Sequence, residues 1–145
     1  MQLRLGLACA ALLVATPAEA GLCTLSLPTP GGLALSADGL RLGSEETGVA
    51  TPGTLTVLSV GSSTLTVDPP VWTQVPAEYQ PGAESREVRY TAPLSGGSQA
   101  YTAMSSSITV PNLLNAVILT INNRVTNPQG FAAGDYRTRT VVTCS

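Results

Sequence analysis

The segment GFAAGDYRTRTVVTCS, residues 130–145, combines a turn with a strand and carries a cysteine at position 144. The glycine and aspartate before Tyr136 favour a turn, because glycine adopts positive φ and aspartate bonds its own backbone. The threonines and valines that follow favour β-structure. A tail that frays into solvent needs neither a strand nor a cysteine, so we expect this segment to be fixed against the rest of a β-protein.

Similar runs recur along the rest of the chain. We expect strands at residues 23–28, 33–36, 53–60, 63–68, 86–92, 100–110, 115–123 and 135–144. The sequences between them include TPGG, ADG, DPP, SGG and NPQG, in which proline fixes φ and glycine supplies positive φ. Hardly any window carries apolar residues at helical spacing. About seven short strands at this spacing predict an all-β fold, one antiparallel Ig-like β-sandwich.

The first 20 residues have the order of a secretory signal peptide: Arg4, an apolar run at 5–15 and the small-residue site at 18–20. We therefore expect cleavage after Ala20 and one domain at residues 21–145, exported to the periplasm, the cell surface or the exterior of a bacterium. A buried N-terminal helix is the alternative. A lipid anchor on Cys23 is less favoured, because Leu22 and not a small residue precedes it. The longest later apolar run, residues 116–121, is far shorter than the roughly 20 residues of a membrane span.

Two cysteines, Cys23 and Cys144, remain once the signal peptide is removed. Disulfides persist in exported proteins, and two cysteines allow one intramolecular pairing. A Cys23–Cys144 bond would tie the first mature strand to the last. Intermolecular disulfides and two free thiols are the alternatives.

Charged residues are sparse, with seven arginines, nine carboxylates, no lysine, no histidine and a net charge of −2. Nucleic-acid binding needs a basic stripe, which the sequence lacks. The commonest general base and the usual zinc ligands are also missing, because there is no histidine. Asp38-Gly39 is typical of a turn and not of a calcium loop. We therefore expect no cofactor, no metal and no nucleic-acid partner.

Paired carboxylates could still serve a glycosidase. The candidates are Glu45, Glu46, Glu78, Glu84 and Glu87. Adjacent glutamates on a strand point to opposite faces, and a solvated surface accounts for the others. We do not expect an enzyme.

The longest expected connection, residues 69–85, contains Trp72 and Tyr79. Long surface loops on rigid scaffolds often bind partners, so these two side chains could contact a partner. The interpretation that we favour is that Val71 and Trp72 continue the preceding strand beyond a Pro-Pro bulge, with Trp72 packed on the core.

Arg137 and Arg139 alternate along the last expected strand and could form a patch that binds anions. The alternative is a solvated strand edge, whose charges protect it from unwanted pairing. Tyr136, at the entry of this strand, is typical of a structural corner or core residue in sandwiches.

The last strand resembles that of the spore coat protein U family and of related pilin-like domains of chaperone–usher systems, which enter this strand through Gly-x-Tyr and continue with alternating threonine and valine. The matching residues are Gly134, Asp135, Tyr136, Thr140, Val142 and Thr143. The resemblance covers about the final fifth of the chain. It implies an incomplete sandwich whose missing strand is supplied first by a periplasmic chaperone and then by the N-terminal extension of the next subunit, by β-strand complementation. The partners that it implies are a periplasmic chaperone, an usher or neighbouring pilin-like subunits. By analogy the strand-pairing edge would carry Gly134, Tyr136, Val141 and Val142.

Two features depart from this family. Almost nothing precedes Cys23 in the mature chain that could serve as a donor arm, and the family's usual disulfide joins early strands. The departures favour a self-contained domain, or a subunit that accepts a strand without donating one. We therefore expect a non-enzymatic structural or adhesive subunit of a surface assembly. The alternative is a self-complete exported module that binds a carbohydrate or a protein.

Overall fold

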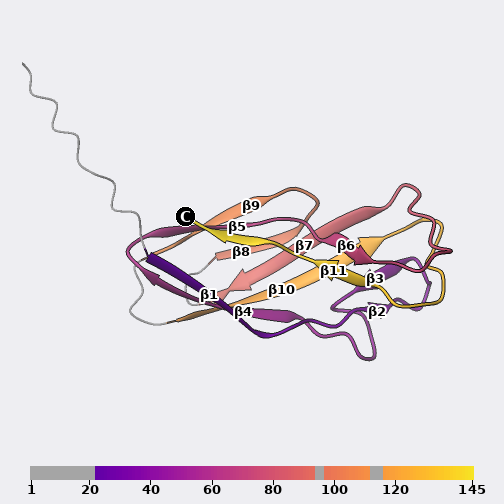
Figure 1. Cartoon of the computed structure of the whole chain (residues 1–145), viewed down its shortest axis with the longest axis horizontal. Helices are drawn as coiled ribbons and strands as arrows, with labels where there is room; N and C mark the ends of the chain where they lie inside the picture. The colour runs from indigo at the N-terminus through magenta and orange to yellow at the C-terminus, as the bar shows by residue number, and fades with distance from the viewer. Residues whose placement is uncertain (1–21, 94–96, 112–115) are drawn as a thin grey trace, which may run out of the picture.

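The computed structural model describes residues 22–93, 97–111 and 116–145, with the side chains of 27 and 28 excepted. These residues form two packed layers of antiparallel strands without an α-helix (Figure 1). The predicted all-β sandwich is therefore confirmed. The predicted signal peptide lies outside the described residues.

The first layer is built around β10 (Val117–Thr126), which has neighbours on both edges. Along one edge it pairs with β4 (Gly53–Val60) and then with β3 (Arg41–Gly43), and along the other with β7 (Ser85–Ala92). Three outer strands complete the layer: β1 (Leu22–Thr29) pairs with β4, β2 (Ala34–Leu35) with β3, and β8 (Gly97–Thr102) with β7.

The second layer consists of two short sheets that follow one another along the same two segments of the chain, with a break between them. β5 (Ser63–Val67) pairs with β9 (Ser106–Val110) and with β12 (Val142–Cys144). Beyond the break, β6 (Val71–Gln74) pairs with β11 (Arg137–Arg139). Pro69 and Pro70 cause the break on one strand, because proline has no N–H to donate to a ladder.

The structure divides some of the expected strands. The expected run at 100–110 is two strands, β8 and β9, which pair in different layers. The last expected strand is likewise divided into β11 and β12. The residues that the structure describes form twelve short strands, where about seven were expected. Val71 does continue the strand beyond the prolines, so the connection that was expected to span 69–85 is shorter, because β6 occupies part of it.

Alternation of apolar and polar side chains produces one continuous apolar core. Val57, Leu65, Val88, Tyr90 and Leu119 come from four different strands and are all fully buried. Their β-branched, aromatic and leucine side chains fill the space between the layers. Burial of apolar surface stabilises the fold by about 25 cal/mol for each Å² removed from water. The core occupies the half of the sandwich that contains β5, β9 and β12.

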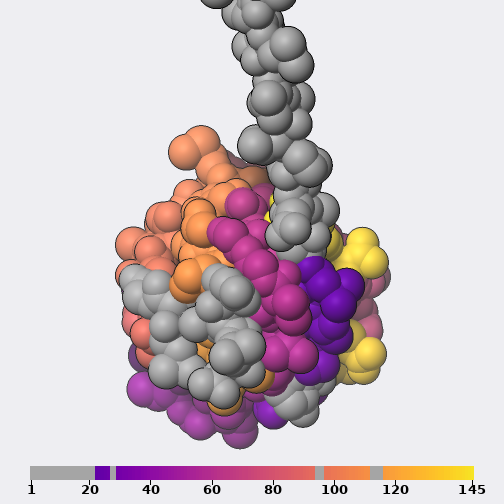
Figure 2. Space-filling model, turned by 90° about the vertical axis from the view of Figure 1, so that its left-hand side faces the viewer, coloured from indigo at the N-terminus to yellow at the C-terminus, as the bar shows by residue number. Residues whose placement is uncertain are grey.

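A disulfide between Cys23 and Cys144 closes this half. It joins β1, an edge strand of the first layer, to β12, an edge strand of the second. Figure 2 shows β1 in indigo beside the yellow C-terminal segment on this end of the molecule. The predicted pairing is confirmed. It holds together the two layers at an edge where no ladder of hydrogen bonds joins them.

Candidate functional site

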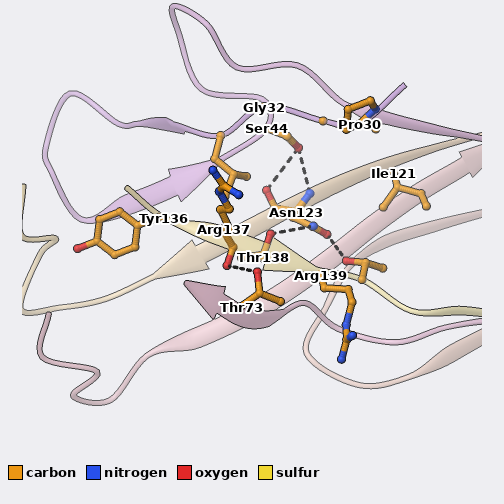
Figure 3. A pocket seen from close by; sticks show the side chains of 14 residues that line it. Pro30, Gly32, Ser44, Thr73, Ile121, Asn123, Tyr136, Arg137, Thr138 and Arg139 are labelled. Carbon is orange, nitrogen blue, oxygen red and sulfur yellow. Dashed lines mark hydrogen bonds between the residues drawn. The ribbon is translucent and has the colours of Figure 1, made fainter. Parts of the chain in front are cut away.

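A groove of about 550 Å³ opens between the layers in the other half of the sandwich. One wall is the segment from Pro30 to Leu33, with Gly53 beside it. The opposite wall is β11 with its flanking residues, from Tyr136 to Thr140. The floor comes from β10, through Ile121 and Asn123 (Figure 3).

The first wall depends on a close approach between two backbone segments. A Cβ atom on Gly31 would lie 2.7 Å from the backbone nitrogen of Gly53, which is closer than real Cβ atoms come. Only glycine therefore fits at position 31 without a shift of one segment. The approach fixes the segment beside β4 and keeps it off the groove floor.

The groove exists because the space between the layers turns from apolar to polar here. Asn123 points inward from β10, where Val117 and Leu119 fill the core nearer the disulfide. Its side-chain amide donates to the Thr138 hydroxyl (3.4 Å) and its carbonyl accepts from the Thr140 hydroxyl (2.8 Å). Figure 3 shows the bond between Asn123 and Thr138, which crosses from the floor to β11. Polar side chains of this kind position β11 over β10 without sealing the layers as apolar packing would.

Ser44 ties the same position of β10 to its own layer. Its backbone N–H donates to the Asn123 carbonyl (3.0 Å), and its hydroxyl accepts from the Asn123 N–H (3.0 Å). The hydroxyl also donates to the buried amide oxygen of Asn122 (3.1 Å). The groove floor is therefore a hydrogen-bonded network, in which both the backbone and the side chain of Asn123 take part.

β11 presents an unpaired edge to the groove. Its one partner among the described strands is β6, so its other edge has no strand beside it. β1 is likewise paired only with β4 within the part of the chain that the structure describes. An unpaired strand edge offers a row of N–H and C=O groups to which an extended chain can bond.

Arg137 and Arg139 both lie on the exposed side of β11 but do not form one patch. Figure 3 shows Arg137 extending toward the side of the groove on which Ser44 lies, and Arg139 extending away from it. The ladder with β6 shifts register between Arg137 and Thr138. The residue left without a partner is Thr73 of β6, so the bulge lies on β6 and the alternation of side chains along β11 is intact.

Four aromatic side chains pack together beside the groove. Trp72, Tyr79, Phe131 and Tyr136 lie with ring centroids 5.4–5.8 Å apart. Most of the contacts are edge-to-face or tilted, which is the geometry that aromatic quadrupoles favour. Tyr136 belongs to both the cluster and the groove wall, and its hydroxyl donates to the Ala132 carbonyl (2.9 Å). The aromatic cluster therefore packs against Tyr136, the residue that immediately precedes β11.

Glu84 organises the polar side of the aromatic cluster. The Trp72 indole N–H donates to its carboxylate at 3.1 Å, the Tyr79 hydroxyl donates to the same carboxylate, and Arg86 forms an ion pair with it at 3.3 Å. Burial, followed by the hydrogen bond to Glu84, raises the pKa of Tyr79 to about 12. The neutral phenol is thus the form that this site stabilises.

We expect Tyr79 to make the protein lose stability at alkaline pH. The pKa of tyrosine in an unfolded chain is about 10, so the contribution of the neutral phenol is complete below about pH 10 and is lost as the pH rises toward about 12. The difference in melting temperature between wild type and Tyr79→Phe should therefore narrow over this range. Thermal unfolding from pH 8 to pH 12 measures it. A difference that stays constant across the range would contradict the assignment.

The structure separates the sequence-predicted site residues into four places. Cys23 and Cys144 form the disulfide, and Val142 packs on the core next to it. Tyr136 lines the groove, and Gly134 precedes it with a φ of 140° that suits glycine. The remaining three are Val141, which is exposed between β11 and β12, and Trp72 and Tyr79, which belong to the aromatic cluster.

The glutamates considered for catalysis are absent from the groove lining. Four of them are engaged with arginines: Glu45 with Arg89, Glu46 with Arg41, Glu84 with Arg86 and Glu87 with Arg124. Among the described residues no group of three or more histidine, cysteine, aspartate or glutamate side chains is placed to hold a metal ion.

Sequence reasoning missed Asn123 and Ser44, which build the groove floor. The signal was present in the run AVILTINN, where asparagine interrupts an apolar alternation at an inward position. A polar residue on the core face of a strand indicates either a hydrogen-bonded partner across the layers or an opening. Here both are found.

Comparison of the chain with known protein families, curated proteins and solved structures gave no match. No helix in the described ranges is long and apolar enough to cross a membrane.

Proposed function

We propose that the protein is an exported, non-enzymatic structural or adhesive subunit of a bacterial surface assembly, which accepts an extended segment of a partner at the free edge of β11. The observation that carries the proposal is that this unpaired strand edge lies beside a groove of about 550 Å³. In β-strand addition, main-chain hydrogen bonds give affinity while alternate side chains enter a groove and give specificity. The free edge of β11 offers the main-chain hydrogen-bonding groups, and the groove offers space for the alternate side chains. The partner would be a periplasmic chaperone, an usher or a neighbouring subunit.

The acceptor role does not require the partner to complete the apolar core. Val57, Leu65 and Tyr90 are already fully buried, and the disulfide closes the layers beside them. A shaft subunit with a missing core strand would expose such residues. The closed core therefore supports a subunit that receives a strand at one end and is stable before it does so.

The second candidate is a self-complete exported module that binds a carbohydrate or a protein. The same closed core favours it, together with the polar lining of the groove through Asn123, Thr138 and Thr140. The two candidates differ in what enters the groove, because strand addition requires a peptide backbone beside β11.

The test is binding of a peptide of alternating threonine and valine to the protein recovered from an oxidising compartment. We expect a monomer by light scattering, whose free energy of unfolding rises by about 2–3 kcal/mol when the peptide is present at roughly a hundred times its dissociation constant. Amide exchange should slow in residues 137–140.

A matched pair of variants locates the peptide. Leu33→Trp places a bulky ring on the groove wall and should abolish binding. Leu35→Trp, two residues further on, makes the same change at an exposed position outside the groove lining and should leave binding intact. If the peptide binds both variants equally, or if a polysaccharide binds and no peptide does, strand acceptance at β11 is wrong.

A further inference from the structure

Arg137 and Arg139 lack the carboxylate partners that the other described arginines have. The four arginines elsewhere in the described residues, Arg41, Arg86, Arg89 and Arg124, each lie within 3.3 Å of a glutamate oxygen. No ion pair within the described ranges involves Arg137 or Arg139. The chain has more carboxylates than arginines, so these two cations are not left over for want of acidic residues.

The groove also contains no acidic residue that could neutralise them. Its lining consists of glycine, proline, aliphatic, hydroxyl and amide residues, with Tyr136 and the two arginines. Arg137 extends toward the side of the groove on which Ser44 lies (Figure 3). A cation in a concave site that lacks acidic neighbours attracts negatively charged groups, and a guanidinium suits a carboxylate because it donates two parallel hydrogen bonds.

We propose that the extended segment accepted by β11 carries an acidic side chain, which forms an ion pair with Arg137. This inference rests on the proposed function, because it names the chemistry of the strand that the same groove receives. The free edge of β11 selects an extended backbone, and Arg137 selects a carboxylate on it. Together they discriminate among strands that the backbone alone would accept equally.

A second copy of this chain does not fit the site through the same edge. Pairing of β11 with β11 of another molecule would bring arginines of the two strands together, and like charges on facing strands are destabilising. Charges on an edge strand commonly prevent unwanted pairing. The two arginines would therefore have two effects: they would repel a second β11, and they would attract an acidic strand.

The experiment compares three peptides of about eight residues, acetylated and amidated so that their termini are uncharged. All alternate threonine and valine, and one central threonine is replaced by glutamate, glutamine or lysine. We expect wild type to bind the glutamate peptide about fivefold more tightly than the glutamine peptide, which is the upper range for an exposed ion pair. The lysine peptide should bind most weakly. The preference should shrink as salt is added, because salt screens exposed charges.

Arg137→Gln should remove the preference for glutamate, so that the glutamate and glutamine peptides bind this variant with equal affinity. Arg89→Gln is the matched control, because it makes the same charge change on β7 outside the groove lining, and it should leave the preference intact. A preference that survives Arg137→Gln overturns the inference. Competition by free acetylated glutamate amide at the same concentration also overturns it, because the site would then bind a compact anion.

The failure of this inference is distinguishable from that of the proposed function. Equal binding of the glutamate and glutamine peptides to wild type means that β11 accepts strands without regard to charge, so only the inference fails. Binding of none of the three peptides contradicts both.

Discussion

Replacing Cys23 and Cys144 together by serine is expected to lower the free energy of unfolding by about 4–5 kcal/mol. The bond closes a loop with a sequence separation of 121 residues, and a cross-link over a long loop removes a large entropy from the unfolded chain. β12 is only three residues long and pairs with β5 alone among the described strands. Without the bond, its attachment depends on a short ladder and on Val142.

Urea denaturation of the double variant and of wild type, at the same pH and temperature, measures this difference. Wild type reduced with a thiol should match the variant, which controls for the two substitutions themselves. A loss of less than about 1 kcal/mol would mean that the unfolded chain is already constrained or that the native bond is strained, and the entropic account would be wrong.

Trp72→Ala is expected to cost about 3 kcal/mol of stability, the lower end of the range for truncation of a tryptophan, because Trp72 is only partly buried. The indole contacts Tyr79 and Tyr136 with ring centroids 5.7 and 5.5 Å away, and its N–H donates to Glu84. Its loss leaves a void in the aromatic cluster and removes one donor from a carboxylate that several groups share.

Denaturant unfolding together with near-ultraviolet circular dichroism tests the prediction, with Tyr101→Ala as the control. Tyr101 lies outside the aromatic cluster, where its ring contacts Arg124 and its hydroxyl donates to Glu45, so its removal should cost much less. If Trp72→Ala is as stable as wild type but fails to bind a partner, Trp72 contacts a partner and does not stabilise the fold, which was the alternative drawn from the sequence.

The strands were predictable where apolar and polar residues alternate over several positions. β4, β5, β7 and β10 follow such runs closely, because inward side chains at every second residue build one buried face. The Cys23–Cys144 pairing followed from the two cysteines that remain once the predicted signal peptide is removed, and from the export that this peptide implies. Neither inference requires knowledge of which strands are neighbours.

The groove was not predictable, because it depends on which strands are neighbours. It depends on Asn123 facing Thr138 and Thr140 across two layers, and on Gly31 approaching Gly53 within one layer. Such contacts follow from register and sheet order, which local sequence does not contain. The aromatic cluster likewise gathers residues from β6, a connecting segment and the approach to β11. The division of residues 100–110 between two layers was missed because both halves have strand-like composition.

The pairing of β12 with β5 also constrains how quickly the fold can form. Thr143 lies opposite Thr66, and Cys144 bonds to Cys23, so the second layer is completed by contacts between distant parts of the sequence. Topologies dominated by such non-local contacts fold slowly, in milliseconds to seconds for small β-proteins. Until β12 docks, β5 has an open edge beside an unfinished core. Partly folded chains are therefore exposed to aggregation during this interval, and conditions that delay disulfide formation should lengthen it.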